Sequence, residues 1–531
     1  MPHSSTAAPP ARTFRESLWA MAGICLVIML VALDSTVVGT AMPRIVAELQ
    51  GYDLYPWIAS SYLMTNAVLI PIIGRLGDLY GRKPFVLASV VVFTLASVLC
   101  GAAQTMMQLV LARGLQGVGG GMLTGVAFAC VTDLFPDRVQ RVRWQAMMSA
   151  TFGVASAVGP ALGGWLTEHA GWRSVFFINL PVALCAFPMV WRFLPRIVHH
   201  TGGDRSIDWL GAALLAAAIV TLLLGTEKGQ SAGFTHAWFI VLIVAAVALG
   251  VWFVRHQRSS RAPVVPMRMF ARAGVKRLAA LGVLTGLVMF GLVFYSPLML
   301  QGGFGMSPNT AGVTLTPLLV CVTLGSIING RLMTRMQKPE RLLTYGLALL
   351  FVGCVALAFV DPTTPRPLVM LAFGICGLSL GFQLPNLTLQ IQACVERHDL
   401  GAASALIQTT RMLGSMIGTS VGAAIVNLTF ARQAANAMAN AGVSDARIVS
   451  LLQSPQVLIR EEDHAALLDI AQSLGINAAP LLEQVRAGLV SGVHHTYIAC
   501  ALLVIVSFCI SLRLPHYAIG KPKGQPPGAA R

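Results

Sequence analysis

The sequence predicts an all-α protein that crosses a lipid bilayer fourteen times, and three observations lead to this fold class. Hydrophobic residues make up 56% of the 531 residues and charged residues only 11%, whereas soluble domains average about 45–50% and about 25%. Apolar runs of the length that spans a bilayer as a helix recur from end to end. Lysine and arginine gather in alternate loops. A disordered chain, a secreted disulfide scaffold and an ordinary cytosolic enzyme are thereby excluded.

The fourteen spans follow one another along the chain, and each is too long and too uniformly apolar for a strand of a membrane barrel. They are expected near residues 17–38, 57–76, 85–104, 107–131, 144–166, 175–194, 209–226, 237–254, 277–300, 311–333, 342–360, 367–394, 403–429 and 491–513.

The orientation follows from the positive charges in the loops. With the N-terminus in the cytoplasm, 27 of the 37 lysines and arginines fall on the cytoplasmic side and only 8 on the outer side. Positive residues favour the cytoplasmic face of a membrane protein, so both termini are expected in the cytoplasm, in the inner or plasma membrane. The net charge of +16 therefore reflects topology, and no nucleic-acid partner is expected. The ten cysteines form no C-x-x-C pair, and no metal site is expected.

Weak internal repetition divides the chain into two related halves. The stretch Gly74–Lys83 is echoed by Gly330–Pro339, and Gly159–Gly164 is echoed by Gly418–Ala423, at similar offsets. Two parallel repeats of six spans are a transporter architecture. The expected divisions are an N-tail at 1–16, a six-helix bundle at 17–200, an inserted helix pair at 201–260, a second six-helix bundle at 261–515 and a C-tail at 516–531.

A long outer loop at 430–490 interrupts the second bundle. Apolar residues recur in it at helical spacing, for example at Leu467, Ile470 and Leu474. This pattern indicates either a short helical element that rests on the membrane surface or on the protein itself, or a docking site for a partner protein.

Asp34 and Arg113 are the charged residues expected to carry proton coupling. A charge inside a span is costly and indicates function. Burial would favour the protonated form of Asp34, and Arg113 on the fourth span could sense its charge or hydrogen-bond to Gln116 and to backbone carbonyls. The alternatives are a hydrated Asp34 near the outer interface and a purely structural Arg113.

The ten residues Gly74–Lys83 form a candidate inner gate at the cytoplasmic end of span two. Asp78 can cap the next helix or accept bonds from that helix's N-terminal amides, and Arg82 and Lys83 can pair with Asp78 or with acids on another span. Such a latch would hold one of two states. The alternative is topology anchoring by positive charge alone. The residues proposed for the gate are Gly74, Asp78, Gly81, Arg82 and Lys83.

Span five carries small residues and a proline that favour close packing and a bend. Gly153, Ala157, Pro160 and Gly164 fall on one helical stripe, and generic packing is the alternative. The residues proposed for this element are Gly153, Gly159, Pro160, Gly163 and Gly164.

Polar and aromatic residues in the spans are candidates for a substrate cavity. Polar stripes on apolar helices face a bundle interior or a water-filled cavity, and aromatic rings can wall a lipophilic ligand. Interhelical hydrogen bonding and simple packing are the alternatives. The candidates are Gln116, Phe290, Phe294, Tyr295, Gln383, Asn386, Gln390, Gln408 and Arg411.

Together these stretches resemble the major facilitator superfamily, and more narrowly its fourteen-spanning drug–proton antiporters. The matching segments, in order, are L-D-S-T-V-V-G-T-A-M-P at Leu33–Pro43, Gly74–Lys83, R-G-L-Q-G-V-G-G-G at Arg113–Gly121, G-P-A-L-G-G at Gly159–Gly164 and W-R-S-V-F-F-I-N-L-P at Trp172–Pro181. The resemblance implies a major facilitator fold that exports drug-like compounds in exchange for protons. It gives Asp34 and Arg113 the coupling role and makes Gly153–Gly164 the helix associated with antiport.

The expected partners are a small lipophilic substrate, protons and the lipid bilayer, with the proton gradient as energy source and no cofactor. Residues 277–333 contain no acid, where some members of the family carry one, so anionic, neutral and monovalent lipophilic substrates remain open. Some relatives in bacteria with two membranes work with a periplasmic adaptor and an outer-membrane channel, and the sequence leaves that open. The rival functions are a narrow-specificity metabolite or siderophore exporter and a receptor that does not transport. No catalytic arrangement points to an enzyme.

Overall fold

The computed structural model is helical throughout the part of the chain that it describes, and it contains no strand there. The expected C-tail lies outside that part, as does the N-tail before Thr13. The described residues are 13–49, 54–135, 137–197, 207–232, 236–260, 262–336, 338–396, 399–441, 445–452, 455–458, 461–473 and 478–515. Fourteen segments in it are long and apolar enough to cross a bilayer, which confirms the predicted number of spans.

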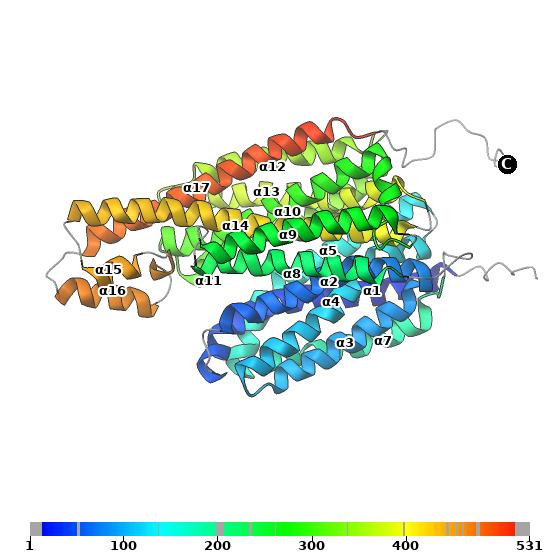
Figure 1. Cartoon of the computed structure of the whole chain (residues 1–531), viewed down its shortest axis with the longest axis horizontal. Helices are drawn as coiled ribbons and strands as arrows, with labels where there is room; N and C mark the ends of the chain where they lie inside the picture. The colour runs from blue at the N-terminus through cyan, green and yellow to red at the C-terminus, as the bar shows by residue number, and fades with distance from the viewer. Residues whose placement is uncertain are drawn as a thin grey trace, which may run out of the picture.

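Six spans make up the N-terminal half of the molecule, which Figure 1 draws in blue to cyan. The sixth span is the short helix α6 followed directly by α7. The helices of this half are α1 (Phe14–Leu49), α2 (Tyr55–Tyr80), α3 (Arg82–Ala102), α4 (Met106–Leu134), α5 (Arg138–His169), α6 (Ser174–Phe177) and α7 (Asn179–Phe193).

Two inserted helices, α8 (Trp209–Ala232) and α9 (Ala237–Ser259), pair with each other between the halves in sequence. Helix α8 also packs on one helix of each half, in a small apolar cluster that includes Ala67 of α2 and Met416 of α14. The pair therefore lies beside the line where the halves meet.

The C-terminal half repeats the six-span arrangement, and a single π-helical turn, η3, ends its first helix. A short 3-10 turn, η2 (Met267–Ala271), leads into it. The elements are α10 (Ala273–Leu298), η3 (Met299–Gly303), α11 (Pro308–Met333), α12 (Arg341–Ala358), α13 (Arg366–Ala393), α14 (Leu400–Ala441) and α17 (Ala478–Ser511).

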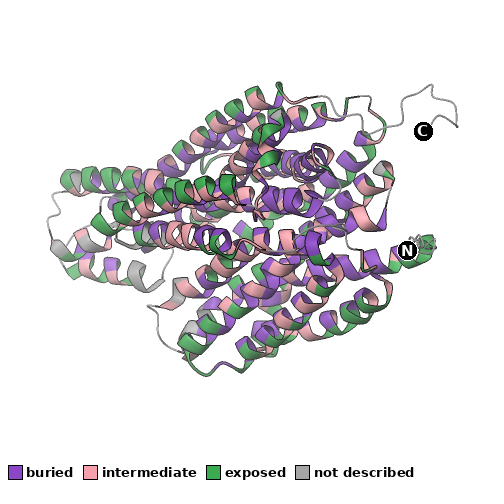
Figure 2. Ribbon diagram, turned by 45° about the vertical axis from the view of Figure 1, so that its right-hand side comes forward, coloured by how far each residue is buried: buried purple, intermediate pink, exposed green. Residues whose placement is uncertain are grey.

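The expected outer loop is largely helical. Helices α14 and α17 continue into it well past the predicted spans, and the short elements α15 (Ala446–Leu451), η5 (Pro455–Leu458) and α16 (Glu461–Ser473) lie between them. Buried apolar residues such as Ala437, Leu467 and Leu481 join this segment to the core of the C-terminal half. We call residues 430–490 the distal segment. It projects at the end opposite to the one where α1 begins and α17 finishes (Figures 1 and 2). We call those two ends the distal end and the terminal end.

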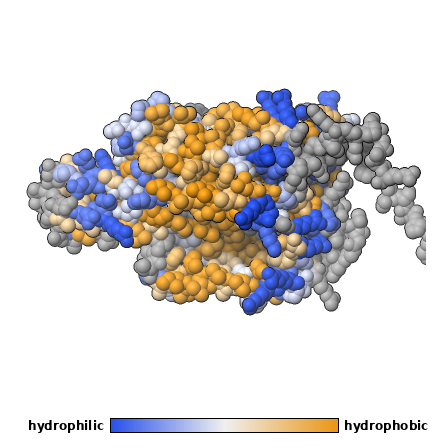
Figure 3. Space-filling view, turned by 90° about the horizontal axis from the view of Figure 1, so that it is seen from above, coloured by the Kyte–Doolittle hydropathy of each residue, from blue (hydrophilic) through white to orange (hydrophobic). Residues whose placement is uncertain are grey.

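Glycines allow the close helix contacts within each half. A Cβ at Gly121 of α4 would lie 2.6 Å from the Asn66 carbonyl oxygen of α2, and one at Gly418 of α14 would lie 2.5 Å from the Leu287 carbonyl oxygen of α10. Backbones approach this closely only where side chains are absent. On the face that Figure 3 shows, a broad apolar band lies between the two ends, with hydrophilic residues at either side, as a bilayer requires.

Candidate functional site

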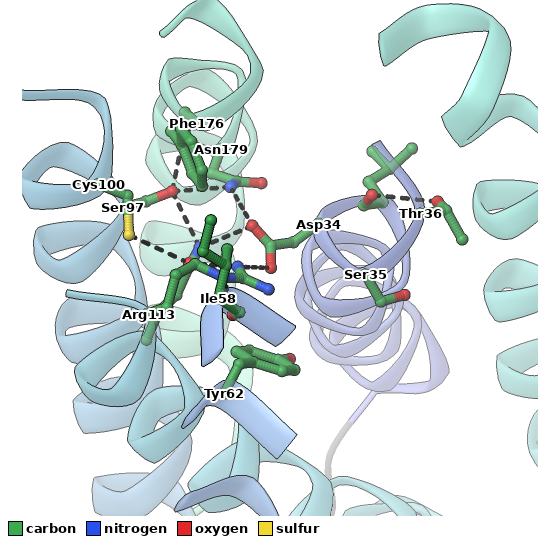
Figure 4. A network of polar contacts seen from close by, with 12 residues as sticks. Asp34, Ser35, Thr36, Ile58, Tyr62, Ser97, Cys100, Arg113, Phe176 and Asn179 are labelled. Atoms are coloured by element: carbon green, nitrogen blue, oxygen red, sulfur yellow. Dashed lines mark hydrogen bonds and ion pairs between the residues drawn. The ribbon is translucent and has the colours of Figure 1, made fainter. Parts of the chain in front are cut away.

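Asp34 lies within the membrane-spanning part of α1, and its side chain is 1% exposed. Its carboxylate points toward α4 and α7 (Figure 4). A buried carboxylate stays ionised only with a partner charge and hydrogen bonds. Helix α4 supplies both, because Arg113 Nη1 donates to Asp34 Oδ2 at 2.6 Å and Gln116 Nε2 donates to Asp34 Oδ1 at 2.8 Å. The structure thus brings Asp34 and Arg113, the two charged residues expected to carry proton coupling, into direct contact.

The Arg113 guanidinium is held from several sides. Its Nη1 also donates to Gln116 Oε1 at 2.7 Å, and its Nε donates to the Ile58 carbonyl oxygen of α2 at 3.3 Å. Its Cζ atom lies 4.5 Å from the centre of the Tyr62 ring, within cation–π range. Arg113 therefore ties α1, α2 and α4 together around one ion pair.

Ser97 of α3 and Asn179, the first residue of α7, complete the network. Asn179 Nδ2 donates to Ser97 Oγ at 2.8 Å and to Asp34 Oδ1 at 3.4 Å, while Ser97 Oγ accepts from Gln116 Nε2 at 3.1 Å and donates to the Phe176 carbonyl oxygen at 3.0 Å. Sequence reasoning did not select either residue. Asn179 lies inside the Trp172–Pro181 stretch that carried part of the resemblance, whereas Ser97 has no comparable signal.

Without a bound ligand, the chemistry open to this network is the binding and release of a proton at Asp34. It holds one negative and one positive charge, each with several hydrogen-bond partners, in a bundle interior where charges are costly. Protonation of Asp34 would remove the negative charge and leave Arg113 uncompensated. Loss of one partner of a buried pair costs about 3–5 kcal/mol, so proton binding would strain the helices that the pair holds together.

A second cluster joins the two halves at the terminal end. Asp78 of α2 accepts from the backbone N–H of Gly401 at 3.0 Å and of Ala402 at 2.8 Å, both in the first turn of α14. A carboxylate at a helix N-terminus is stabilised by the free amides and by the helix dipole. The expectation that Asp78 caps the next helix is wrong. The side chain caps α14 of the other half instead, and α3, whose N-cap is Gly81, has no side-chain cap.

Arg82 and Lys83 take different partners. Arg82 Nη2 donates to Asp78 Oδ1 at 2.9 Å and its Nη1 donates to Asp133 Oδ1 at 2.5 Å, so Arg82 links α2 to α4. Lys83 Nζ donates to the Trp191 carbonyl oxygen of α7 at 2.6 Å. Gly81 has φ +88°, a backbone conformation that favours glycine, and it allows the turn that places Arg82 under Asp78.

Further contacts across the halves lie at the same end. Gln145 Nε2 of α5 donates to Gln392 Oε1 of α13 at 2.8 Å, and Gln392 Nε2 donates to the Phe128 carbonyl oxygen of α4 at 3.4 Å. Arg75 of α2 lies 3.8 Å from the Asp399 carboxylate. Gly74 of the motif lies against α14, since a Cβ there would meet the Gly401 carbonyl oxygen at 3.2 Å. We call these contacts, with those of Asp78, the terminal latch.

The small residues of α5 contact two different helices. Gly159 and Gly163 face α1, where a Cβ at Gly163 would lie 2.7 Å from the Val37 carbonyl oxygen, whereas Gly153 faces Thr323 of α11 in the other half. Gly164 has open space around it, and Pro160 is exposed. The predicted stripe of Gly153, Ala157, Pro160 and Gly164 therefore does not pack as one tight contact, and Gly159 and Gly163 form the contact with α1.

The polar candidates of α13 lie inside the C-terminal half. Gln383, Asn386 and Gln390 are buried. Thr285 Oγ1 of α10 donates to Gln383 Oε1 at 3.2 Å, and Asn386 Nδ2 donates to Asn329 Oδ1 of α11 at 2.7 Å. In this state Gln383 and Asn386 make interhelical hydrogen bonds, which was the alternative considered for them.

The remaining candidates lie on α10 and α14. Phe294 is 57% exposed, while the neighbouring Tyr295 is buried and its hydroxyl donates to the Thr419 carbonyl oxygen of α14. Phe290 is half-buried, as is Arg411, and Gln408 is 3% exposed. The candidates therefore do not line one common surface in this conformation.

Comparisons with known proteins agree with this architecture. The sequence profile described as the Major Facilitator Superfamily matches residues 24–208 and 204–419. The multidrug transporter protein MdtP of Bacillus subtilis is 32% identical over 406 residues, which cover 76% of this chain and 74% of MdtP. Multidrug resistance protein 3 of the same organism is also 32% identical, over 75% of this chain and 77% of its own length.

Among solved structures, the human organic anion transporter MFSD10 (TETRAN) aligns with a TM-score of 0.63 over 95% of this chain and 100% of its own, at 14% identity. At that identity the likeness concerns the fold alone. Profile, relatives and fold agree with the helix arrangement described above. The chain therefore belongs to the major facilitator superfamily, alongside relatives that are named as multidrug transporters.

Proposed function

We propose that this transporter exports lipophilic, drug-like compounds across the cytoplasmic membrane in exchange for protons, by alternating access, with its terminal end in the cytoplasm. The observation that carries the proposal is the buried pair of Asp34 and Arg113. The names of the relatives support a drug-like substrate, and the distribution of lysine and arginine supports the orientation.

Proton coupling would follow from the charge balance of the pair. With Asp34 ionised, Arg113 draws α1 and α4 together through a 2.6 Å bond. A proton on Asp34 would weaken that bond, and the helices would find a new arrangement in which Arg113 meets other acceptors, such as substrate or water. Substrate and proton would then compete for the same conformational change, which is the requirement for exchange.

Alternating access would use the terminal latch. The bonds from Asp78 to Gly401 and Ala402 hold the halves together at the terminal end, so this conformation is closed there. Exposure of a central cavity to the cytoplasm would require the two halves to rock apart and break these bonds. A packed interface with two discrete states is a known way to convert a local charge change into such a movement.

The test is flux in proteoliposomes with an acidic lumen. Three fluorescent compounds would be followed: the cation ethidium, the neutral N-phenyl-1-naphthylamine and the anion 8-anilino-1-naphthalenesulfonate. A lumenal pH dye would report protons. Wild type should accumulate at least one compound with release of protons, and Asp34→Asn should insert normally but show only background flux. The matched control is Glu168→Gln, which removes an exposed carboxylate of α5 and should behave as wild type.

Two results would contradict the proposal at different levels. Full gradient-driven flux by Asp34→Asn would remove Asp34 from the coupling step. Absence of flux and of proton release with every compound, in liposomes that contain folded protein, would reject export and favour a receptor.

A further inference from the structure

The charges within the membrane interior do not balance. Asp34 and Arg113 neutralise each other, but Arg411 of α14 adds a second positive charge. Among the described residues, no hydrogen bond or ion pair joins the Arg411 guanidinium to any protein group. The nearest acid in the sequence, Asp399, lies twelve residues earlier, just before α14 begins, and is 3.2 Å from Arg268. In the described part of the membrane interior, Arg411 is thus a positive charge with no acid paired to it.

The position of Arg411 excludes an anchor at the membrane surface. It stands eleven residues after Leu400, where α14 begins, which places it about 17 Å along the helix axis, near the middle of a hydrocarbon core about 30 Å thick. An arginine near a helix end reaches the interface with its side chain, but this one is too deep. A charge there costs about 3 kcal/mol on insertion scales.

Arg411 shares its face of α14 with polar residues. Gly414 and Gly418 pack on the backbone of α10, and Met412 and Met416 pack in the cluster with α2 and α8. Ser404, Gln408, Arg411 and Ser415 recur at spacings of three and four on a third face. At the terminal end of that face, Gln392 of α13 donates to Ser404 Oγ at 2.8 Å.

Gln408, one turn before Arg411, also lacks a partner. Its side chain is 3% exposed, and its Oε1 makes no hydrogen bond in the described part of the chain. Buried polar groups are nearly always satisfied, and the amide and carbonyl positions of a glutamine are interchangeable by rotation. The Arg411 guanidinium and the Gln408 side-chain amide, on successive turns, thus have hydrogen-bonding capacity that no described protein group satisfies.

We infer that Arg411, with the amide of Gln408, binds an anionic group of the substrate, so that this transporter prefers lipophilic organic anions such as carboxylates and sulfonates. The planar fork of a guanidinium matches two oxygens of such a group. The inference rests on the proposed export function, because it names the class of compound exported.

A binding measurement on purified full-length protein in a nonionic detergent tests the substrate class separately from flux. The matched probes are 8-anilino-1-naphthalenesulfonate and N-phenyl-1-naphthylamine, which differ only by the sulfonate. Titration calorimetry should show wild type binding the sulfonate at least about tenfold more tightly, as a hydrogen bond to a charged group predicts.

Substitutions of Arg411 test how much its positive charge contributes to sulfonate binding. Arg411→Gln should weaken sulfonate binding by about 10- to 100-fold and leave N-phenyl-1-naphthylamine within about twofold. Arg411→Lys should lose less sulfonate affinity than Arg411→Gln, because lysine keeps the positive charge but lacks the planar fork of the guanidinium. The control Arg432→Gln removes an exposed positive charge from the same helix, and it should change neither affinity. Thermal unfolding of each variant shows that it is folded.

Each of the following results either supports the assignment of Arg411 to anion binding or overturns it. Equal affinity of wild type for the two probes overturns the inference even if Arg411→Gln fails to fold, and so does an unchanged sulfonate affinity in folded Arg411→Gln. Proton-driven flux that does not favour the sulfonate also overturns it and leaves the proposed function intact. Sulfonate binding that depends on Arg411, without driven flux of any compound, upholds the site and rejects export.

Discussion

Glu48, at the distal end of α1, holds the turn that precedes α6. Trp172 Nε1 donates to Glu48 Oε2 at 2.8 Å, Arg173 forms an ion pair with the same carboxylate, and the Arg173 Cζ atom lies 4.4 Å from the centre of the Trp172 ring. The hydrogen bonds from Arg173 and Trp172 lower the pKa of Glu48. One carboxylate therefore holds this turn against α1.

This lowered pKa predicts how the turn responds to acid. The bond contributes stability above the ordinary glutamate pKa of about 4.3 and is lost as pH falls through the lower value of the folded protein. The fluorescence that Trp172 contributes, obtained by subtracting Trp172→Phe from wild type, should be constant from pH 7 to about 4.5 and change below about 4.3. Glu48→Gln should show no such transition, and a midpoint near 6 would contradict the assignment.

Single residues were predictable from the sequence to different degrees. Asp34 and Arg113 were selected because a charge in an apolar span is costly wherever it lies, so rarity alone identifies it. Ser97 and Asn179 were not selected, because serine and asparagine cost little free energy inside a membrane span and occur in many spans. Only the three-dimensional packing of α3 and α7 shows that both reach the Asp34 carboxylate or its hydrogen-bond partners.

At the scale of the helix, two adjacent glycines of α5 give a matched comparison. Gly163→Ala would bring a Cβ within 2.7 Å of the Val37 carbonyl oxygen of α1, whereas Gly164 has nothing within 4 Å. Overpacking of this kind costs about 1–3 kcal/mol. Gly163→Ala should lower the thermal unfolding midpoint in detergent while Gly164→Ala changes it little. Equal midpoints would show that α1 and α5 separate freely at this contact.

Spans could be predicted because a bilayer demands a fixed length of apolar helix. The extensions of α14 and α17 into the distal segment could not. Residues 430–490 are too polar for their hydropathy to identify them as part of a membrane span. Their helices are stabilised by one another through apolar residues such as Phe430, Ala434 and Val485. That information is in the tertiary packing, not in any local window.

At the scale of the whole molecule, the terminal latch predicts a shift between states. Asp78→Asn would remove the charge that attracts Arg82 and the N-terminus of α14. Loss of such a charge is worth about 1–2 kcal/mol, or a factor of about 5–30 in population. In a cysteine-free background, Gln145→Cys and Gln392→Cys should cross-link at the terminal end, and Asp78→Asn should slow this by that factor. An unchanged rate, or the same slowing by Asp361→Asn in an exposed turn, would contradict the latch.

The division into two halves could be predicted from the internal repeat, and the position of the inserted pair could not. Helix α8 is apolar on all sides, so its sequence does not mark which face contacts protein and which contacts lipid. The structure places Leu214 and Ile219 of α8 against α2 and α14. Nor could the repeat show which end of the molecule is closed, since the same sequence must form both states.

Helix α14 runs unbroken from Gly401, at the terminal latch, past Arg411 to the buried Ala437 of the distal segment. Its 42 residues measure about 63 Å, twice the thickness of the hydrocarbon core. The helix therefore extends well beyond the membrane, and a small tilt at one end produces a larger displacement at the other. Each degree of tilt about the terminal end displaces the far end by about 1 Å. In the proposed rocking movement, a displacement too small to see at Asp78 would thus be larger at the distal end, where an antibody fragment bound to α16 would both report the state of the terminal latch and resist its release.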